Sequence, residues 1–144
     1  MTVFCDTSVL VASSVRGHPH YGPAFAALKK VIRRENKGVL SSHSLAEAYA
    51  VLTTLPLKPA IHPLEARRII EENFVRHFEI VLLGTADYRR VIEQMAGLGW
   101  SGGLIYDALL LHCAQKKHCN RIYTFNVAHF QKLGPDLHDR ICAP

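Results

Sequence analysis

The sequence lacks any long apolar segment. No apolar run approaches the roughly 18 to 20 residues that a membrane-spanning helix needs. The first residues, MTVFCDTSVLVASS, have no basic residue ahead of their apolar run, and Asp6 interrupts that run, so they do not match an export signal. We therefore expect a soluble protein with no membrane partner, in which the first residues form a buried strand.

Paired cysteines are also lacking. The four cysteines form no CxxC pair and lie mostly in apolar surroundings, which is typical of reduced, buried thiols in a cytoplasmic protein. They are Cys5, Cys113, Cys119 and Cys142. The nine histidines do not have the spacing of a closed structural zinc site either. A fold held together by disulfides or zinc is therefore not expected.

Repeats and low-complexity segments are absent, which argues against extensive disorder. What is present is a chain of 144 residues, 49% hydrophobic and 20% charged. We expect one domain over residues 1–144 with a sizeable core. The net charge of +5 suits a partner with a phosphate backbone, although the basic clusters at 29–37 and 67–68 are equally typical of solvated helix faces.

Three carboxylates stand in unusual surroundings. Asp6, Glu47 and Asp107 lie in the apolar or small-residue stretches VFCDTSVL, SLAEAYAVL and GGLIYDALLLHCA. Burying three negative charges near one another is prohibitive without a compensating cation. A metal-centred acidic pocket accounts for all three and indicates an enzyme rather than a scaffold.

Short β-rich runs alternate with helical patterns along the chain. This order predicts βαβ units and a mainly parallel sheet with helices on both faces. The expected strands are residues 2–5, 38–42, 78–83, 121–124 and, at an edge, 140–143. The expected helices are one capped by Thr7 or Ser8 that runs to residue 14, then 24–36, one that Ser42 or Ser44 opens and Pro56 stops, and then 62–75, 86–98, 104–114 and 126–133.

Local signals predict where helices end and which faces they bury. Asn36 and Gly38 are stop signals for the second helix. The third helix has an apolar stripe that includes Tyr49 and Leu52, and Glu47 lies off that stripe on a flank with small neighbours.

Four polar positions fall at one edge of the expected sheet. Asp6 ends the first strand, Glu47 follows the second, Asp107 begins a helix and Asn126 follows the fourth strand. Reactive groups of parallel α/β folds gather at the carboxyl ends of the strands. Carboxylate oxygens from separate elements suit Mg²⁺ or Mn²⁺, and such a site can hydrolyse phosphodiesters by lowering the pKa of a bound water.

The motifs FCDTSVL, SLAEAYAVLT, YDALLLHCA and IYTFNVAHF, in this order, resemble those of the PIN-domain nucleases, and most of all the VapC-type toxins of bacterial toxin–antitoxin pairs. The resemblance implies a PIN-like three-layer α/β/α sandwich with a central, mainly parallel sheet of four to five strands. It implies a metal-dependent ribonuclease, with Mg²⁺ or Mn²⁺ held by Asp6, Glu47 and Asp107 and with Asn126 at the fourth position. It also implies an RNA substrate, a cognate antitoxin protein and a homodimer.

The sequence departs from the family's acidic pattern at two points. Asn126 stands where Asp is more usual, and Ala128 and His129 stand where another acid often precedes the Phe. Because an amide oxygen can bind a metal but supplies no charge, we expect one dominant metal ion and a second recruited by substrate phosphate. Ser8 and Thr124 could orient ligands or substrate, and His129 could contact a phosphate or modulate the metal.

Two other functions stay open. An apolar strand followed by Asp-Thr also suits a phosphohydrolase with Asp6 as covalent nucleophile, but the usual acid two residues later is Ser8. A PIN-like chain weakened at Asn126 could be a non-catalytic RNA-binding or regulatory module, although Tyr and Phe at core spacing indicate no stacking platform. Structural roles are open too, with Asp6 as a helix cap, Glu47 at a solvated helix edge and Asn126 in a turn.

Overall fold

A computed structural model describes residues 1–144, the whole printed chain. At its centre is a sheet of five strands in the order β3-β2-β1-β4-β5, in which every neighbouring pair is parallel. The strands are β1 (Thr2–Cys5), β2 (Lys37–Ser41), β3 (Phe78–Val81), β4 (Arg121–Tyr123) and β5 (Ile141–Cys142). The α/β fold expected from the alternating pattern is confirmed, with the last strand at an edge.

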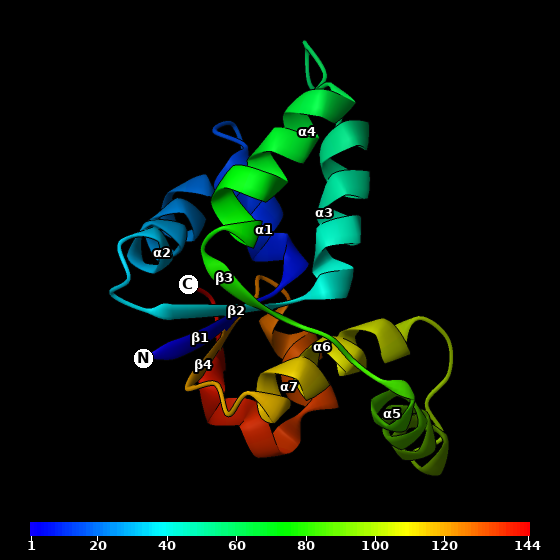
Figure 1. The fold of residues 1–144 in the computed structure, drawn as a ribbon. Coiled ribbons are helices and arrows are strands. Elements are labelled where there is room, and N and C mark those ends of the chain that lie inside the picture. Colours follow the sequence, from blue (N-terminus) through cyan, green and yellow to red (C-terminus); the bar gives the residue numbers. More distant parts are fainter.

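Helices cover both faces of the sheet (Figure 1). On one face lie α1 (Thr7–Ser14), α2 (Tyr21–Ile32), α3 (Ser42–Thr54) and α4 (Pro63–Ile69), which continues into the π-helix η1 (Ile70–Val75). On the other lie α5 (Thr85–Gly97), α6 (Leu104–Lys116) and α7 (Val127–Leu133), followed by the 3₁₀-helix η2 (Pro135–Arg140). The result is the expected three-layer arrangement.

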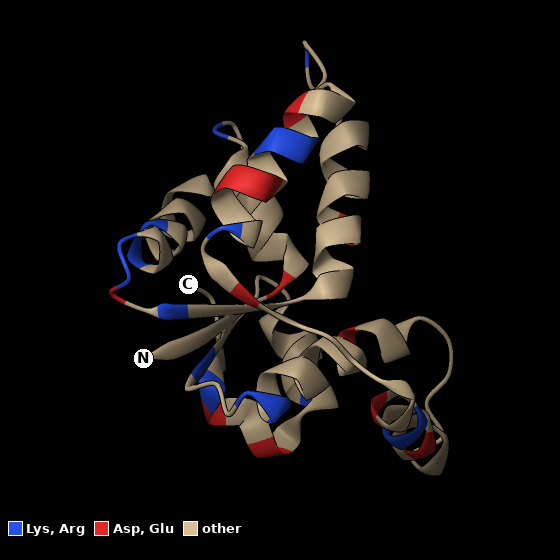
Figure 2. Ribbon diagram, viewed as in Figure 1, with Lys and Arg blue, Asp and Glu red and all other residues tan.

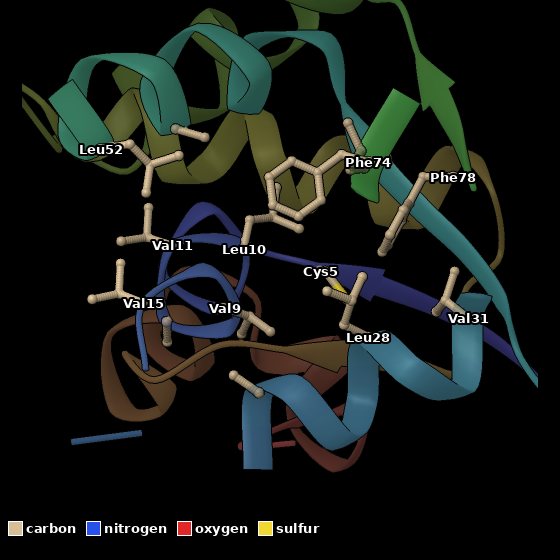
Figure 3. Close-up of a cluster of buried hydrophobic side chains, with 14 of the residues drawn as sticks. Cys5, Val9, Leu10, Val11, Val15, Leu28, Val31, Leu52, Phe74 and Phe78 are labelled. Carbon is tan, nitrogen blue, oxygen red and sulfur yellow. The ribbon is translucent and has the colours of Figure 1, made fainter. Parts of the chain in front are cut away.

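Strand β1 is buried on both of its faces, as the middle strand of such a sheet must be. Val3 and Cys5 belong to the hydrophobic cluster on the side of α1, α2 and α3, part of which Figure 3 shows. Phe4 points the other way, into the cluster that α6 and α7 complete. Because side chains alternate along a strand, β1 packs against the helices on both faces of the sheet. This packing fixes the position of Asp6, the residue that follows β1.

The ends of two expected helices are wrong. The helix expected over 24–36 begins at Tyr21 and ends at Ile32, because Arg34 takes a left-handed conformation with φ of 60° that no helix continues through. Gly38 is not a stop signal but part of β2. In the helix expected over 62–75, the second half is π-helical rather than α-helical.

Two local assignments on the first and third helices are also wrong. Neither Thr7 nor Ser8 caps α1, since the N-cap position belongs to Asp6. Tyr49 is not part of a buried stripe, because it is 43% exposed. The buried positions of α3 are Ser44, Ala48 and Leu52. The Ser44 hydroxyl accepts a hydrogen bond of 3.0 Å from Thr7 Oγ1, so a hydrogen bond as well as apolar packing joins α1 to α3.

The four cysteines are unpaired, as expected, and three of them are buried. Burial raises the pKa of the Cys5 thiol to about 12 and that of Cys119 to about 11, so both stay protonated and unreactive at neutral pH. None of the helices combines the length and the apolar character needed to cross a lipid bilayer.

Gly38 leaves no room for a side chain, which provides a test of the packing around β2. A Cβ at this position would lie 2.5 Å from Val31 Cγ1 and 2.6 Å from Phe78 Cδ1. We expect Gly38→Ala to lower the free energy of unfolding by about 1–3 kcal/mol through overpacking, measured by urea denaturation. The control is Gly97→Ala at the end of α5, where a Cβ meets nothing within 4 Å. If Gly38→Ala unfolds at the wild-type urea concentration, the contacts to Val31 and Phe78 do not constrain the strand.

Candidate active site

The buried carboxylate of Asp6 lies at the carboxyl end of β1, where α1 begins. Its side chain makes none of the hydrogen bonds of a helix cap. Instead, the hydroxyls of Ser8 and Thr124 donate to Asp6 Oδ2 over 2.7 Å and 2.8 Å. Because both donors engage the same oxygen, Oδ1 is left free of hydroxyl donors. A capping role alone does not explain this arrangement.

Backbone N–H groups hold the two hydroxyls in place. The N–H of Asn126 donates to Thr124 Oγ1 over 3.0 Å, and the N–H of Phe125 donates to Ser8 Oγ over 3.2 Å. A hydroxyl has one proton of its own, so each hydroxyl that accepts a backbone N–H keeps its proton for Asp6. The segment that follows β4 thus holds Asp6 through two relays. Asn126, at the N-cap position of α7, takes part through its main chain.

Glu47 lies in the second turn of α3 with its carboxylate half-buried. Its Oε1 atom is fully buried and makes no hydrogen bond. The nearest cationic group is Nε2 of His43, one helical turn earlier, at 3.1 Å from Oε1 but without hydrogen-bond geometry. A buried carboxylate oxygen without a donor is costly, which is unexpected for a solvated residue at a helix edge.

Asp107 lies in the first turn of α6 and contacts His129 of α7. The distance from Asp107 Oδ2 to His129 Nε2 is 2.8 Å, and the two side chains are 33% and 39% exposed. His129 is therefore in direct contact with Asp107, one of the candidate metal ligands. The helix N-terminus favours the negative charge of Asp107.

The three carboxylates affect one another's charge. Burial is the main cause that raises the pKa of Asp6, and the charge of Asp107 raises it further, against the lowering effect of the Ser8 and Thr124 hydroxyls. Burial also raises the pKa of Glu47; His43 lowers it, while Asp6 and Asp107 raise it. The fold thus brings Asp6, Glu47 and Asp107 within electrostatic reach of one another.

Lysine and arginine do not neutralise this acidic site. Helices α1 and α3 contain neither residue type (Figure 2), and no salt bridge joins a Lys or Arg to Asp6, Glu47 or Asp107. The basic residues lie elsewhere, for example on α2, α4 and α5 (Figure 2). Among basic side chains, only the imidazoles of His43 and His129 contact the carboxylates, at Glu47 and Asp107.

The donor set fits a hard divalent cation. As the side chains stand, no three His, Cys, Asp or Glu groups meet at one point. The carboxylates of Glu47 and Asp107 contact separate histidines. However, the buried Oε1 of Glu47 has no donor, and oxygen ligands of this kind are those that Mg²⁺ and Mn²⁺ prefer. Metal binding by Asp6, Glu47 and Asp107 stays a prediction.

One residue of the site was missed in the sequence. His43 stands four residues before Glu47, a spacing that brings two side chains together on a helix, so the pair could have been found once α3 was recognised. The hydrogen-bond relays to Asp6 could not have been found in this way, since the hydrogen bond from Thr124 to Asp6 joins positions separated by 118 residues.

The sequence matches a family model and two curated relatives. The model described as "PIN domain" matches residues 3–134. Ribonuclease VapC27 of Mycobacterium tuberculosis is 32% identical over 105 residues, which are 73% of this chain and 71% of the relative. Ribonuclease VapC40 of the same species is 33% identical over 106 residues, covering 73% and 72%.

Solved structures show a similar fold at low sequence identity. Mycobacterium tuberculosis VapC20, described as a sarcin-ricin loop cleaving toxin, has a TM-score of 0.70 at 17% identity and covers 92% of this chain and 95% of its own. VapBC2 from Rickettsia felis, bound to a promoter DNA fragment, has a TM-score of 0.64 at 18% identity, covering 92% and 93%. VapBC-1 from nontypeable Haemophilus influenzae has a TM-score of 0.65 at 15% identity, covering 99% and 98%.

The burial of Asp6 predicts a pH-dependent effect of Asp6→Asn on stability. A carboxyl whose pKa is raised on folding contributes stability below its unfolded pKa and loses that contribution as the pH rises through the folded pKa. In EDTA at neutral pH the variant should therefore need more urea to unfold than the wild type, since it carries no buried charge. Below the ordinary Asp pKa of 3.8 this gain should disappear.

The control for this measurement is Asp139→Asn, because the Asp139 side chain is fully exposed. It should leave the urea midpoint nearly unchanged at both pH values. A loss of stability in Asp6→Asn that is the same at neutral and acid pH would mean that the hydroxyl relays, and not the buried charge, dominate at this position.

Proposed function

This chain belongs to the PIN-domain family and its relatives are VapC ribonucleases, and from this premise we propose that it is a ribonuclease that depends on Mg²⁺ or Mn²⁺ and hydrolyses RNA phosphodiester bonds. The observation that carries the proposal is the group of mutually repelling carboxylates of Asp6, Glu47 and Asp107 with no Lys or Arg beside them. A fold tolerates such a group when a cation offsets the charge.

In this proposal Asp6, Glu47 and Asp107 hold the metal, and the amide oxygen of Asn126 is available as a neutral fourth ligand. A bound divalent cation supplies charge stabilisation at the phosphodiester and a water of lowered pKa. The chain's own contribution is orientation. Ser8 and Thr124 occupy Oδ2 of Asp6, which leaves Oδ1 for a further partner.

His129 acts in this proposal as a positioning residue. Its Nε2 atom holds Asp107 Oδ2 at 2.8 Å, so it limits the rotation of a carboxylate in the first turn of a helix. With 39% of its side chain exposed, it is also accessible to a phosphate group of the substrate.

The phosphohydrolase alternative is less well supported. Covalent catalysis by Asp6 needs a partner acid, and the position two residues later is Ser8, whose hydroxyl is committed to Asp6 Oδ2. The alternative of a non-catalytic RNA-binding module rests on the neutral Asn126. It differs from the nuclease in one measurable property, which is whether RNA is cut.

Partners of the chain are part of the same proposal. Two of the similar solved structures are VapBC assemblies, which supports a cognate antitoxin, and family resemblance supports a homodimer. The net charge of +5 favours a polyanionic substrate. A short reading frame for a DNA-binding protein beside this gene is the expected genetic sign of the antitoxin.

The nuclease proposal is tested by incubating the chain with a mixed RNA pool. We expect cleavage with Mn²⁺, none with EDTA, and a loss of at least about 100-fold for Asp107→Asn, since even supporting residues of metal sites cost 10–100-fold. Asp139→Asn makes the same change at a fully exposed position and should cleave like the wild type. Cleavage that survives EDTA or Asp107→Asn contradicts the metal-dependent mechanism.

The neutral residue at the fourth position predicts the metal stoichiometry. Without RNA, calorimetric titration with Mn²⁺ should give one dominant site. Asn126→Asp should bind Mn²⁺ about tenfold more tightly, because an added unit charge next to a divalent cation is worth several kcal/mol before desolvation. The matched control is Asn120→Asp, at the other end of β4. Two tight sites in the wild type, or equal tightening in both variants, would contradict this account.

A further inference from the structure

A small pocket opens beside the candidate active site. It lies where β2 passes into α3 and where β3 leads on toward α5 (Figure 1), and the first turns of α6 close it. Its volume is about 120 Å³. The residues that form most of its lining are Ser42, His43, Leu83, Tyr88, Tyr106 and Leu110.

Two residues of this pocket connect it directly to the carboxylates. His43 lines the pocket and also approaches Glu47 Oε1 at 3.1 Å. Tyr106 lines the pocket and immediately precedes Asp107 on α6. The side chain of His43 thus lies between the pocket and Glu47, one of the candidate metal ligands.

The pocket has aromatic rings at its mouth. Tyr106 is 57% exposed and Tyr88 is 43% exposed, so neither side chain is explained by core packing. The rings of His43 and Tyr106 are nearly parallel, with an interplanar angle of 12° and 6.1 Å between centroids. These two tyrosines are exceptions to the core spacing that most Tyr and Phe residues show in the sequence. The structure supplies the stacking platform that the sequence pattern did not indicate.

The chemistry of the lining favours a nucleobase over a phosphate. None of the lining residues is Lys, Arg, Asp or Glu, and the one ionisable imidazole, that of His43, already faces Glu47 Oε1. It offers apolar walls, aromatic faces and the hydroxyl of Ser42. A nucleobase matches this set, because its faces stack on aromatic side chains while its edge forms hydrogen bonds.

We propose that this pocket takes one nucleobase of the RNA substrate, adjacent to the phosphodiester that the acidic site cuts. The inference rests on the proposed nuclease function and assigns a base-binding pocket beside its site. A base that enters this pocket must be unstacked from its neighbours, so that it can turn toward His43 and Tyr106.

The test combines Tyr106 variants with the removal of single bases. Short single-stranded RNAs, each with one abasic position, are cleaved in Mn²⁺ by the wild type, Tyr106→Ala and Tyr106→Phe. For the wild type, one abasic position next to the cut should raise KM on the order of tenfold, the usual size of a stacking contact. Tyr106→Ala should show that rise with intact RNA and no further rise with abasic RNA, while Tyr106→Phe behaves like the wild type.

The control variant is Tyr49→Ala. Tyr49 is 43% exposed, as Tyr88 is, but it lies on α3 outside the pocket. This variant should respond to base removal as the wild type does. Equal cleavage of intact and abasic RNA by the wild type, or an additive loss in Tyr106→Ala, would overturn the inference while leaving the nuclease proposal in place.

A binding measurement separates the two proposals. RNA that carries the fluorescent base 2-aminopurine at the sensitive position is mixed with Asp6→Asn protein, which should bind without cutting. If the protein quenches the 2-aminopurine fluorescence, and the Asp6→Asn, Tyr106→Ala double variant does not, the result supports the pocket even when no variant cuts RNA. If Asp6→Asn protein binds the RNA but does not quench the fluorescence, the pocket proposal is overturned and the nuclease proposal is not.

Discussion

The structure depends on holding one buried carboxylate at the end of its central strand. Asp6 follows β1, whose side chains belong to both hydrophobic clusters. Asp6 Oδ2 accepts hydrogen bonds from the hydroxyls of Ser8 on α1 and Thr124 after β4. Desolvation works against the charge while the hydroxyls support it. The balance leaves a buried carboxylate that two hydroxyls hold in place and whose charge they offset only in part.

At the acidic site, negative charge is separated from the Lys and Arg residues. The helices that present Asp6 and Glu47 carry no Lys or Arg, whereas α2, α4 and α5 each carry such residues (Figure 2). Histidines are the only basic side chains in contact with Glu47 and Asp107. The proposed divalent cation would therefore displace no salt bridge to Lys or Arg.

The α/β order, the parallel sheet and the edge at which polar residues gather follow from patterns that are local in sequence, such as the apolar run before Asp6 and the helical spacing around Glu47. Features that depend on contacts between distant segments were not visible. Gly38 resembled a helix stop because its close neighbours, Val31 and Phe78, are known only from the fold. The exposure of Tyr106 was not visible either, because the sequence around it is apolar and only the structure shows that its side chain is 57% exposed.

The bond between Thr124 and Asp6 spans 118 residues of sequence, and this has a consequence for how the protein is made. Synthesis proceeds from the N-terminus, so Asp6 and Glu47 leave the ribosome long before the strand that completes their surroundings. Parallel sheets also fold late, since their contacts are non-local. A growing chain that carries the first carboxylates is therefore still without the hydroxyl of Thr124 and the relay through Asn126. For a protein proposed to cut RNA, the order of its own sequence keeps the site incomplete until translation is nearly finished.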